Sequence, residues 1–125
     1  MKTIKLGRTG MDVPVLALGC MRLADADRKQ AAEYFRTALD LGLNFFDHAD
    51  IYAGGRSEEV LADLVRESGV SRDKLILQSK CGTVPGKMYD FSKKHILESV
   101  DGILKRLNTD YLDVLPEGTP ELRDI

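Results

Sequence analysis

Short, largely apolar runs mark this chain, and each is separated from the next by a segment with a helical hydrophobic pattern. The runs lie at residues 15–19, 44–47, 74–80 and 111–115. Runs of this length and composition are typical of strands that are buried on both faces, as the strands of parallel sheets are. We therefore expect the buried residues of these strands to include Leu16, Phe45, Ile76 and Leu112.

Three amphipathic helices are predicted between the strands, because apolar residues recur there at intervals of three and four. Local signals place the ends of these helices. Asp25 or Asp27 caps the first helix, Ser57 caps the second and Ser92 caps the third. Asn108 stands where the third helix should end.

A short hairpin precedes the first of these strands. Ile4 and Leu6 alternate with a lysine, residues 7–10 supply turn residues, and residues 11–13 lead back. The order of hairpin, three strand–helix units and a final strand predicts right-handed crossovers and a parallel sheet. Doubly wound sheets and eight-stranded barrels both begin in this way, and four strands cannot close a barrel of eight. The pattern alone is therefore compatible with a small open sheet and with half a barrel.

Composition is that of one soluble domain. The chain has 125 residues, of which 43% are hydrophobic and 30% charged. Its 18 Lys and Arg against 20 Asp and Glu give a net charge of −2, so neither nucleic acid nor a membrane surface is an expected partner. Cys20 and Cys81 form no disulfide framework and no metal motif, which favours a cytoplasmic protein with reduced thiols.

Residues with useful chemistry gather where the predicted strands end. Asp47 and Tyr52 follow the second strand, and Lys80 ends the third. Because the carboxyl ends of parallel strands meet at one edge, these side chains are expected to lie together. A phenol is a weak acid at neutral pH, and a nearby ammonium makes its proton easier to release. A carboxylate paired with that ammonium keeps it charged and in place, so such a set can protonate an alkoxide.

Two other kinds of site are less well supported. His48 and Asp50 could begin a metal site, but the second histidine, His95, lies on a predicted helix far from them, so no metal site is expected. No G-x-G-x-x-G follows any strand, which disfavours an independent nucleotide-binding sheet.

The sequence resembles the N-terminal half of an aldo-keto reductase over residues 1–115. The resemblance rests on LGRTG at 6–10, LGC at 18–20, FDHADIY at 46–52, Ser57-Glu58, Ser79-Lys80 and DYLD at 110–113. Each motif is weak alone, but together and in this order they are specific. The fold that the resemblance implies is α/β: an N-terminal β-hairpin followed by the first four strands and three helices of a TIM (β/α)8 barrel.

The resemblance also implies roles for individual residues. Tyr52 matches the catalytic proton donor, Lys80 the residue that tunes it, and Asp47 the carboxylate paired with that lysine and part of the cofactor site. Residues Gly19, Cys20 and Met21 match the strand end beside the nicotinamide. The implied cofactor is NADPH or NADH, the implied substrate is a small carbonyl compound, and the implied location is the cytoplasm.

The sequence departs from the family after the fourth strand. The family places a histidine five residues beyond the position of Asp113, and Gly118 stands there instead. Residues 116–125 resemble nothing in the family and are expected to be a separate tail on a barrel cut after its fourth strand. We expect the chain by itself to reduce carbonyl compounds very slowly or not at all. The alternative is an inactive remnant or an association module that pairs with another chain, or with itself, through an open sheet edge.

Overall fold

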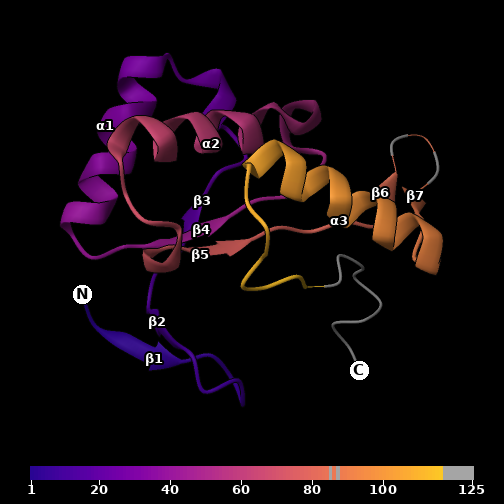
Figure 1. The fold of residues 1–125 in the computed structure, drawn as a ribbon, viewed down its shortest axis with the longest axis horizontal. Coiled ribbons are helices and arrows are strands. Elements are labelled where there is room, and N and C mark those ends of the chain that lie inside the picture. The colour runs from indigo at the N-terminus through magenta and orange to yellow at the C-terminus, as the bar shows by residue number, and fades with distance from the viewer. Residues whose placement is uncertain (85, 87, 117–125) are drawn as a thin grey trace.

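Three helices cover one face of a short parallel sheet, and a separate hairpin lies on the other side (Figure 1). The computed structural model describes residues 1–84, 86 and 88–116. The sheet consists of β3 (Leu18–Gly19), β4 (Phe45–Asp47) and β5 (Ile76–Gln78), and the helices are α1 (Arg28–Asp40), α2 (Arg56–Ser68) and α3 (Lys93–Leu107). The chain thus forms a partial β/α barrel. Among the described residues, no helix is both long and apolar enough to cross a membrane.

The strands pair in parallel, in the order β3-β4-β5. Leu18 is paired with Phe46, and Phe46 with Leu77. The predicted hairpin is also present, with β1 (Thr3–Lys5) antiparallel to β2 (Asp12–Pro14). One further hairpin, β6 (Thr83–Val84) with β7 (Met88–Tyr89), lies in the loop after β5 and was not predicted.

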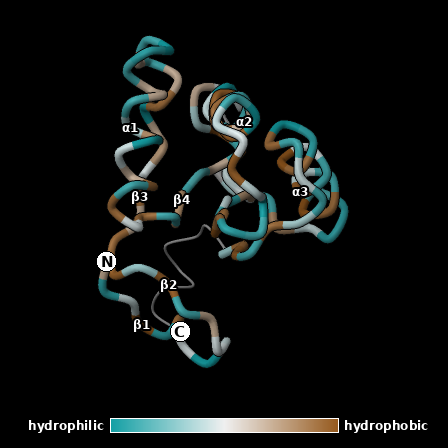
Figure 2. Tube along the Cα trace, turned by 60° about the vertical axis from the view of Figure 1, so that its left-hand side comes forward, coloured by the Kyte–Doolittle hydropathy of each residue, from teal (hydrophilic) through white to brown (hydrophobic). Residues whose placement is uncertain are grey.

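Side chains alternate along β4 and β5 and so build two cores. Phe46 and Leu77 belong to the larger core beneath the helices. Phe45 and Ile76 point the other way and pack with Val13 of the hairpin. Figure 2 shows the same division, with the helices side by side on one side of the strands and the hairpin apart on the other. The hairpin therefore covers part of the face that the helices leave open, where Phe45 and Ile76 lie.

The first predicted strand is shorter than expected. Only Leu18 and Gly19 pair, and the burial predicted for Leu16 is wrong, because its side chain is 61% exposed. The reason is that β3 is an edge strand with a single neighbour in the described part of the chain, and nothing there covers the residues before it. Phe45 and Ile76 are buried as predicted, and Leu112 is partly buried.

The fourth predicted strand, at 111–115, is reduced to one parallel bridge between Gln78 and Val114. The side chain of Asp113 accepts the N–H of Leu77 at 2.9 Å, where a regular ladder would use a strand carbonyl. A side chain has therefore replaced part of the backbone pairing. Residues 117–125, including Gly118, lie outside the described residues.

Helix caps follow local signals in two cases out of three. Asp27, one of the two residues predicted for the first cap, accepts the N–H of Gln30 at 2.9 Å, and Ser92 accepts that of His95 at 3.2 Å, as predicted. The cap predicted at Ser57 is wrong. Helix α2 begins at Arg56, and its cap is Gly55, two residues before Ser57; the φ of Gly55, 93°, is left-handed and suits glycine.

Arg72 fastens the segment after α3 to the start of β5. Its guanidinium donates to Oδ2 of Asp113 at 2.9 Å, to the carbonyl of Tyr111 at 2.8 Å and to Oγ1 of Thr109 at 2.8 Å. The same guanidinium lies 3.9 Å from the centre of the Tyr111 ring. Because Arg72 and Asp113 are only 21% and 18% exposed, this pair is shielded from water more than an ordinary surface ion pair.

Asp113→Ala should destabilise the fold by about 2–3 kcal/mol, because it leaves Arg72 and the N–H of Leu77 without their shared acceptor. The measurement is the free energy of unfolding in urea. Asp110→Ala, at an exposed position in the same segment, is the control and should change this free energy by less than about 0.5 kcal/mol. Equal stability of the two variants would contradict the role given to Asp113.

Candidate active site

The three predicted catalytic residues lie together at the carboxyl ends of β4 and β5. Asp47 is the last residue of β4 and is paired with Gln78 of β5. Lys80 follows two residues after Gln78, so its side chain emerges on the same face of the strand as that of Gln78. Tyr52 begins a short 3-10 helix, Tyr52–Gly55, and its ring centre is 5.4 Å from Nζ of Lys80.

Lys80 is held by two acceptors. Its Nζ donates to Oδ1 of Asp47 at 2.6 Å and to the carbonyl oxygen of His48 at 2.9 Å. The side chains of Lys80 and Asp47 are 26% and 28% exposed, so the pair is half-buried and still open to solvent on one side. These two hydrogen bonds hold the Lys80 amine beside the ring of Tyr52.

Gln78 is a member of this cluster that the sequence analysis missed. Its Nε2 donates to Oδ1 of Asp47 at 2.6 Å, the same oxygen that accepts from Lys80. The i, i+2 spacing of Gln78 and Lys80 was the signal that could have revealed it, since such residues share one face of a strand. Two donors on one oxygen fix the orientation of the carboxylate.

The chain leaves Tyr52 through a left-handed turn. Ala53 has φ 51° and ψ 35°, and Gly54 has φ 64° and ψ 28°. Positive φ is uncommon for alanine, and backbone of this kind often occurs at functional sites. The turn brings the chain directly from Tyr52 into α2, so the position of the ring depends on this loop.

The end of β3 lies beside Asp47. Gly19 is paired with Asp47, and the N–H of Cys20 donates to the Asp47 carbonyl at 2.9 Å. A Cβ at Gly19 would meet no atom within 4 Å, so the space next to this strand end is open. Burial, with the charge of Asp47 in addition, raises the pKa of the Cys20 thiol to about 12, so it remains neutral. Met21 follows and is 57% exposed.

A buried histidine without hydrogen-bond partners among the described residues lies on the helix side of the same strand ends. His48 is fully buried, and neither of its ring nitrogens has a hydrogen-bond partner among the described residues. Burial lowers the pKa of His48 to about 4, so the ring is neutral at physiological pH. Burial also raises the pKa of the Asp50 carboxyl, which Arg106 partly offsets.

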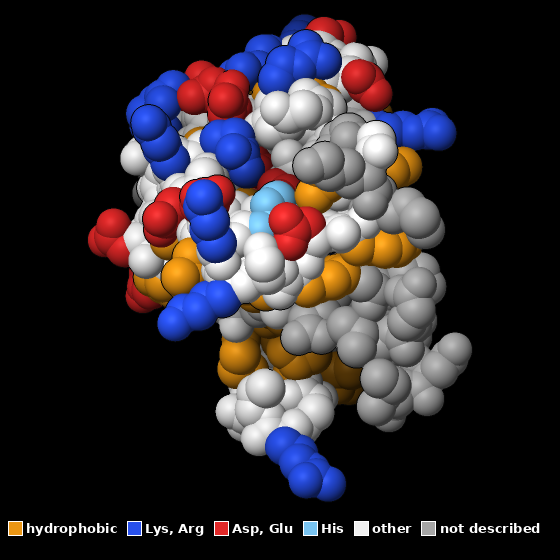
Figure 3. Space-filling model, turned by 90° about the vertical axis from the view of Figure 1, so that its right-hand side faces the viewer, with side chains coloured by type: hydrophobic (Ala, Val, Ile, Leu, Met, Phe, Trp, Pro, Cys, Tyr) orange, Lys and Arg blue, Asp and Glu red, His pale blue; other side chains and the backbone are white. Residues whose placement is uncertain are grey.

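Groups that could hold a metal are spread apart. His95 lies on α3, where it shares a hydrogen bond with Ser99 at 3.2 Å. Within residues 1–84, 86 and 88–116, no three metal-ligating side chains converge. Figure 3 shows Lys, Arg, Asp and Glu side chains interspersed over the upper part of one face, with hydrophobic side chains in a band below them. The phenol of Tyr52, the amine of Lys80 and the carboxylate of Asp47 instead form a set that is suited to proton transfer.

Comparison with known proteins gives one consistent family. The family model described as "Aldo/keto reductase family" matches residues 15–116. The chain is 37% identical to the "Probable voltage-gated potassium channel subunit beta" of Arabidopsis thaliana, with 88% of this chain and 35% of that protein covered. It is also 37% identical to the "Uncharacterized oxidoreductase YqkF" of Bacillus subtilis, with 97% and 40% covered.

Solved structures agree with this result. The holo form of the aldo-keto reductase AKR11C1 from Bacillus halodurans superimposes with a TM-score of 0.83 and 34% identity, covering 97% of this chain and 42% of that chain. The chain thus spans about two-fifths of the length of the proteins that it matches.

His48→Leu should flatten the dependence of stability on pH. Between pH 6.5 and about 4, His48 binds a proton in the unfolded chain but not in the folded one. The free energy of unfolding is therefore highest above pH 6.5 and decreases as the pH falls through this range. The contribution lost over this window is about 3 kcal/mol. Urea unfolding of both proteins at several pH values measures it.

Comparison of the variant with the wild type also controls for the other titrating groups. Burial raises the pKa of Asp50 and of Glu58, so both carboxyls act in the opposite sense, but they do so equally in both proteins. Parallel pH profiles for wild type and variant would show that His48 does not titrate as described.

Proposed function

The chain belongs to the aldo/keto reductase family, and on that basis we propose that it carries the proton-donating residues of an NAD(P)H-dependent carbonyl reductase. The substrate would be a small aldehyde or ketone. Since the chain covers 35–42% of the matched relatives, this activity is proposed for the whole protein to which such a site belongs. Two buried free thiols, Cys20 and Cys81, support a cytoplasmic setting.

The observation that carries the proposal is the contact of Lys80 with both Asp47 and the ring of Tyr52. In the proposed reaction, a hydride adds to the carbonyl carbon and the electron pair of the C=O bond moves to oxygen. The Tyr52 hydroxyl gives its proton to that oxygen, which completes the alcohol and leaves a phenolate. The ammonium of Lys80 stabilises the phenolate, and Asp47 keeps this ammonium in place.

A bound NADPH or NADH would supply the hydride. The open space at Gly19, beside Asp47, supports the proposal that the nicotinamide ring would bind at this strand end, next to Cys20 and Met21. We propose that the chain by itself reduces carbonyl compounds very slowly or not at all. Gly118, at the family's histidine position, has no side chain with which to orient the carbonyl. Good orientation of the reactants can lower the reaction barrier by about 7–11 kcal/mol, so its loss is costly.

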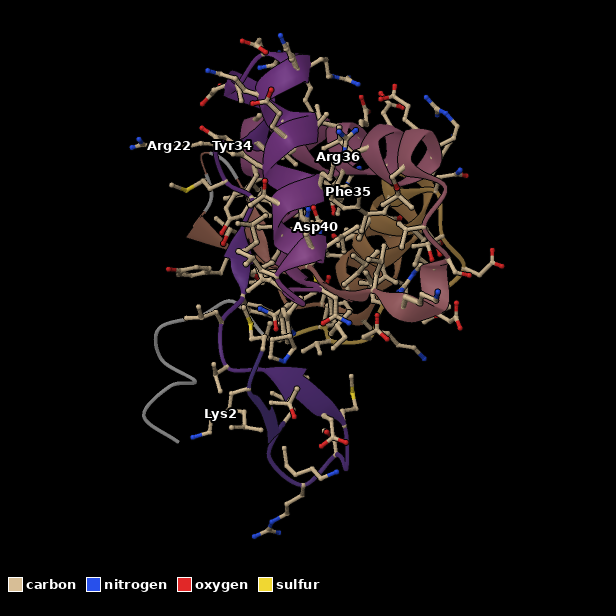
Figure 4. The ribbon with its side chains drawn as sticks, turned by 90° about the vertical axis from the view of Figure 1, so that its left-hand side faces the viewer. Lys2, Arg22, Tyr34, Phe35, Arg36 and Asp40 are labelled. Carbon is tan, nitrogen blue, oxygen red and sulfur yellow. The ribbon has the colours of Figure 1, made fainter. Side chains whose placement is uncertain are left out.

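A second candidate function is association through the open edge of β3. In the described part of the chain, β3 pairs with β4 only, so its other edge is open. An apolar groove of about 470 Å³ lies beside it, lined by residues that include Leu18, Tyr34, Ala38 and Leu41. Figure 4 shows Tyr34 on the side of α1 away from α2, whereas Phe35 points toward α2. Exposed apolar surface next to an unpaired strand favours pairing with a second copy of the chain.

Tyr52→Phe is the test of the proposed reaction. Residues 1–116 of this chain would replace the matched segment of AKR11C1, and the chimera would be assayed for oxidation of NADPH and NADH with a reactive aromatic aldehyde. Loss of the proton donor should lower turnover by about 10²–10⁴-fold.

The control is Tyr111→Phe, which removes a hydroxyl from a ring that packs against Arg72 and lies away from the site. It should leave turnover unchanged. An active chimera in which Tyr52→Phe has no larger effect than Tyr111→Phe would exclude Tyr52 as the acid.

Tyr34→Glu should weaken self-association, because it places a charge on the groove beside β3. Light scattering of the 125-residue chain over a range of concentrations measures the change. The matched control is Leu97→Glu, since Leu97 is 55% exposed on α3 and Tyr34 57% exposed on α1. A wild-type chain that is monomeric at all concentrations and unfolds cooperatively would refute the association.

A further inference from the structure

A buried polar chain lies directly behind Lys80, on the helix side of the sheet. The Oγ of Ser79 donates to Oε2 of Glu58 at 2.9 Å. Nε of Arg106 donates to Oε1 of the same carboxylate at 2.8 Å. Ser79 and Glu58 are both 0% exposed, and the side chain of Arg106 is 28% exposed. These two hydrogen bonds therefore link Ser79, the residue before Lys80, to α2 and α3.

This arrangement is costly to build. Burial raises the pKa of the Glu58 carboxyl, while the bonds from Arg106 and Ser79 lower it. Buried ion pairs are often no more stable than the apolar residues that could replace them. A Cβ at Gly55 would come within 2.8 Å of Cδ of Arg106, and a Cβ at Gly102 within 2.9 Å of its terminal nitrogen, so the Arg106 side chain would have to shift if either glycine were replaced. The ion pair between Arg106 and Glu58 is therefore weak evidence for a purely stabilising role.

The strand end that bears Lys80 needs a support of this kind. The regular ladder of β5 ends at Gln78. Beyond it, the N–H of Ser79 meets the Val114 carbonyl at the longer distance of 3.3 Å, and the Lys80 carbonyl accepts from Asp50 at 3.0 Å. The side-chain hydrogen bond of Ser79 to Glu58 thus ties this segment to α2, in addition to the packing of Cys81 in the core beneath the helices.

Alternation of side chains connects the two faces. With Ser79 fixed toward α2, Lys80 must leave the backbone on the opposite side, where Asp47 lies. We propose that Glu58 is a positioning residue for Lys80, that it acts through Ser79, and that Arg106 anchors it to α3. Its part in catalysis rests on the proposed function, whereas its effect on the backbone at Lys80 does not.

The experiment compares Ser79→Ala with Ser57→Ala in the 125-residue chain. Both serines are fully buried, but the Ser57 hydroxyl has no hydrogen-bond partner among the described residues. Ser79→Ala removes one bond and leaves the Glu58–Arg106 pair intact. Ser57→Ala therefore controls for the loss of a buried hydroxyl next to Glu58.

Amide hydrogen exchange gives a readout at the strand end itself. The Asp50 N–H donates to the Lys80 carbonyl, whereas the His48 N–H donates to the Gln78 carbonyl within the sheet. Ser79→Ala should speed exchange at Asp50 by about tenfold and at His48 much less, and Ser57→Ala should change neither. If Ser79→Ala folds poorly, Ser79→Cys, with its weaker donor, should shift exchange in the same direction by less.

Equal acceleration at Asp50 and His48 would mean that Ser79 serves only overall stability, and no acceleration would mean that the bond positions nothing. Either result overturns the proposal. In the chimera described above, Ser79→Ala should lower kcat several-fold with KM unchanged, and Ser57→Ala should lower neither. Faster exchange at Asp50 in a chimera that is insensitive to Tyr52→Phe would keep the positioning role and reject the proposed function.

Discussion

The parallel register of β4 on β5 decides which side chains meet at the candidate site. Asp47 is paired with Gln78, the last residue of β5, so the next residue on that face of the chain is Lys80. Residues of the other parity, such as Phe46 and Leu77, enter the core beneath the helices. A slip of one residue would exchange these two sets and bury the carboxylate among apolar side chains. The hydrophobic cores on both faces therefore fix the register and, through it, the distance between Asp47 and Lys80.

Because the strands are only two or three residues long, side chains replace much of what a longer ladder would provide. Asp113 takes the place of a strand carbonyl opposite Leu77, and Arg72 fastens it. On the helix side, Glu58 fastens the residue before Lys80. On the other face, Asp47 binds Lys80 directly. The polar residues at this edge thus hold the sheet together and also supply the groups that can move a proton.

Much of this arrangement follows from local and periodic signals in the sequence. Asp47, Tyr52 and Lys80 could be placed together because parallel strands end at one edge, and Asp27 and Ser92 because a cap bonds within its own first turn. What could not be predicted depends on contacts between distant segments. The exposure of Leu16 results from the lack of a second neighbour for β3, and the contact between Arg106 and Glu58 joins residues 48 positions apart.

The two faces of the strand ends differ in what they demand of a polar group. On the helix side, burial keeps His48 neutral and raises the pKa of the Glu58 carboxyl, which the bonds from Arg106 and Ser79 offset only in part. On the other face, the side chains of Asp47 and Lys80 keep about a quarter of their surface exposed, so both remain accessible to solvent. The buried hydrogen bonds thus lie on the helix side, and the solvent-accessible polar groups lie on the other face. Since adjacent residues of one strand serve the two purposes, a change at Ser79 reaches Lys80 through a single peptide unit.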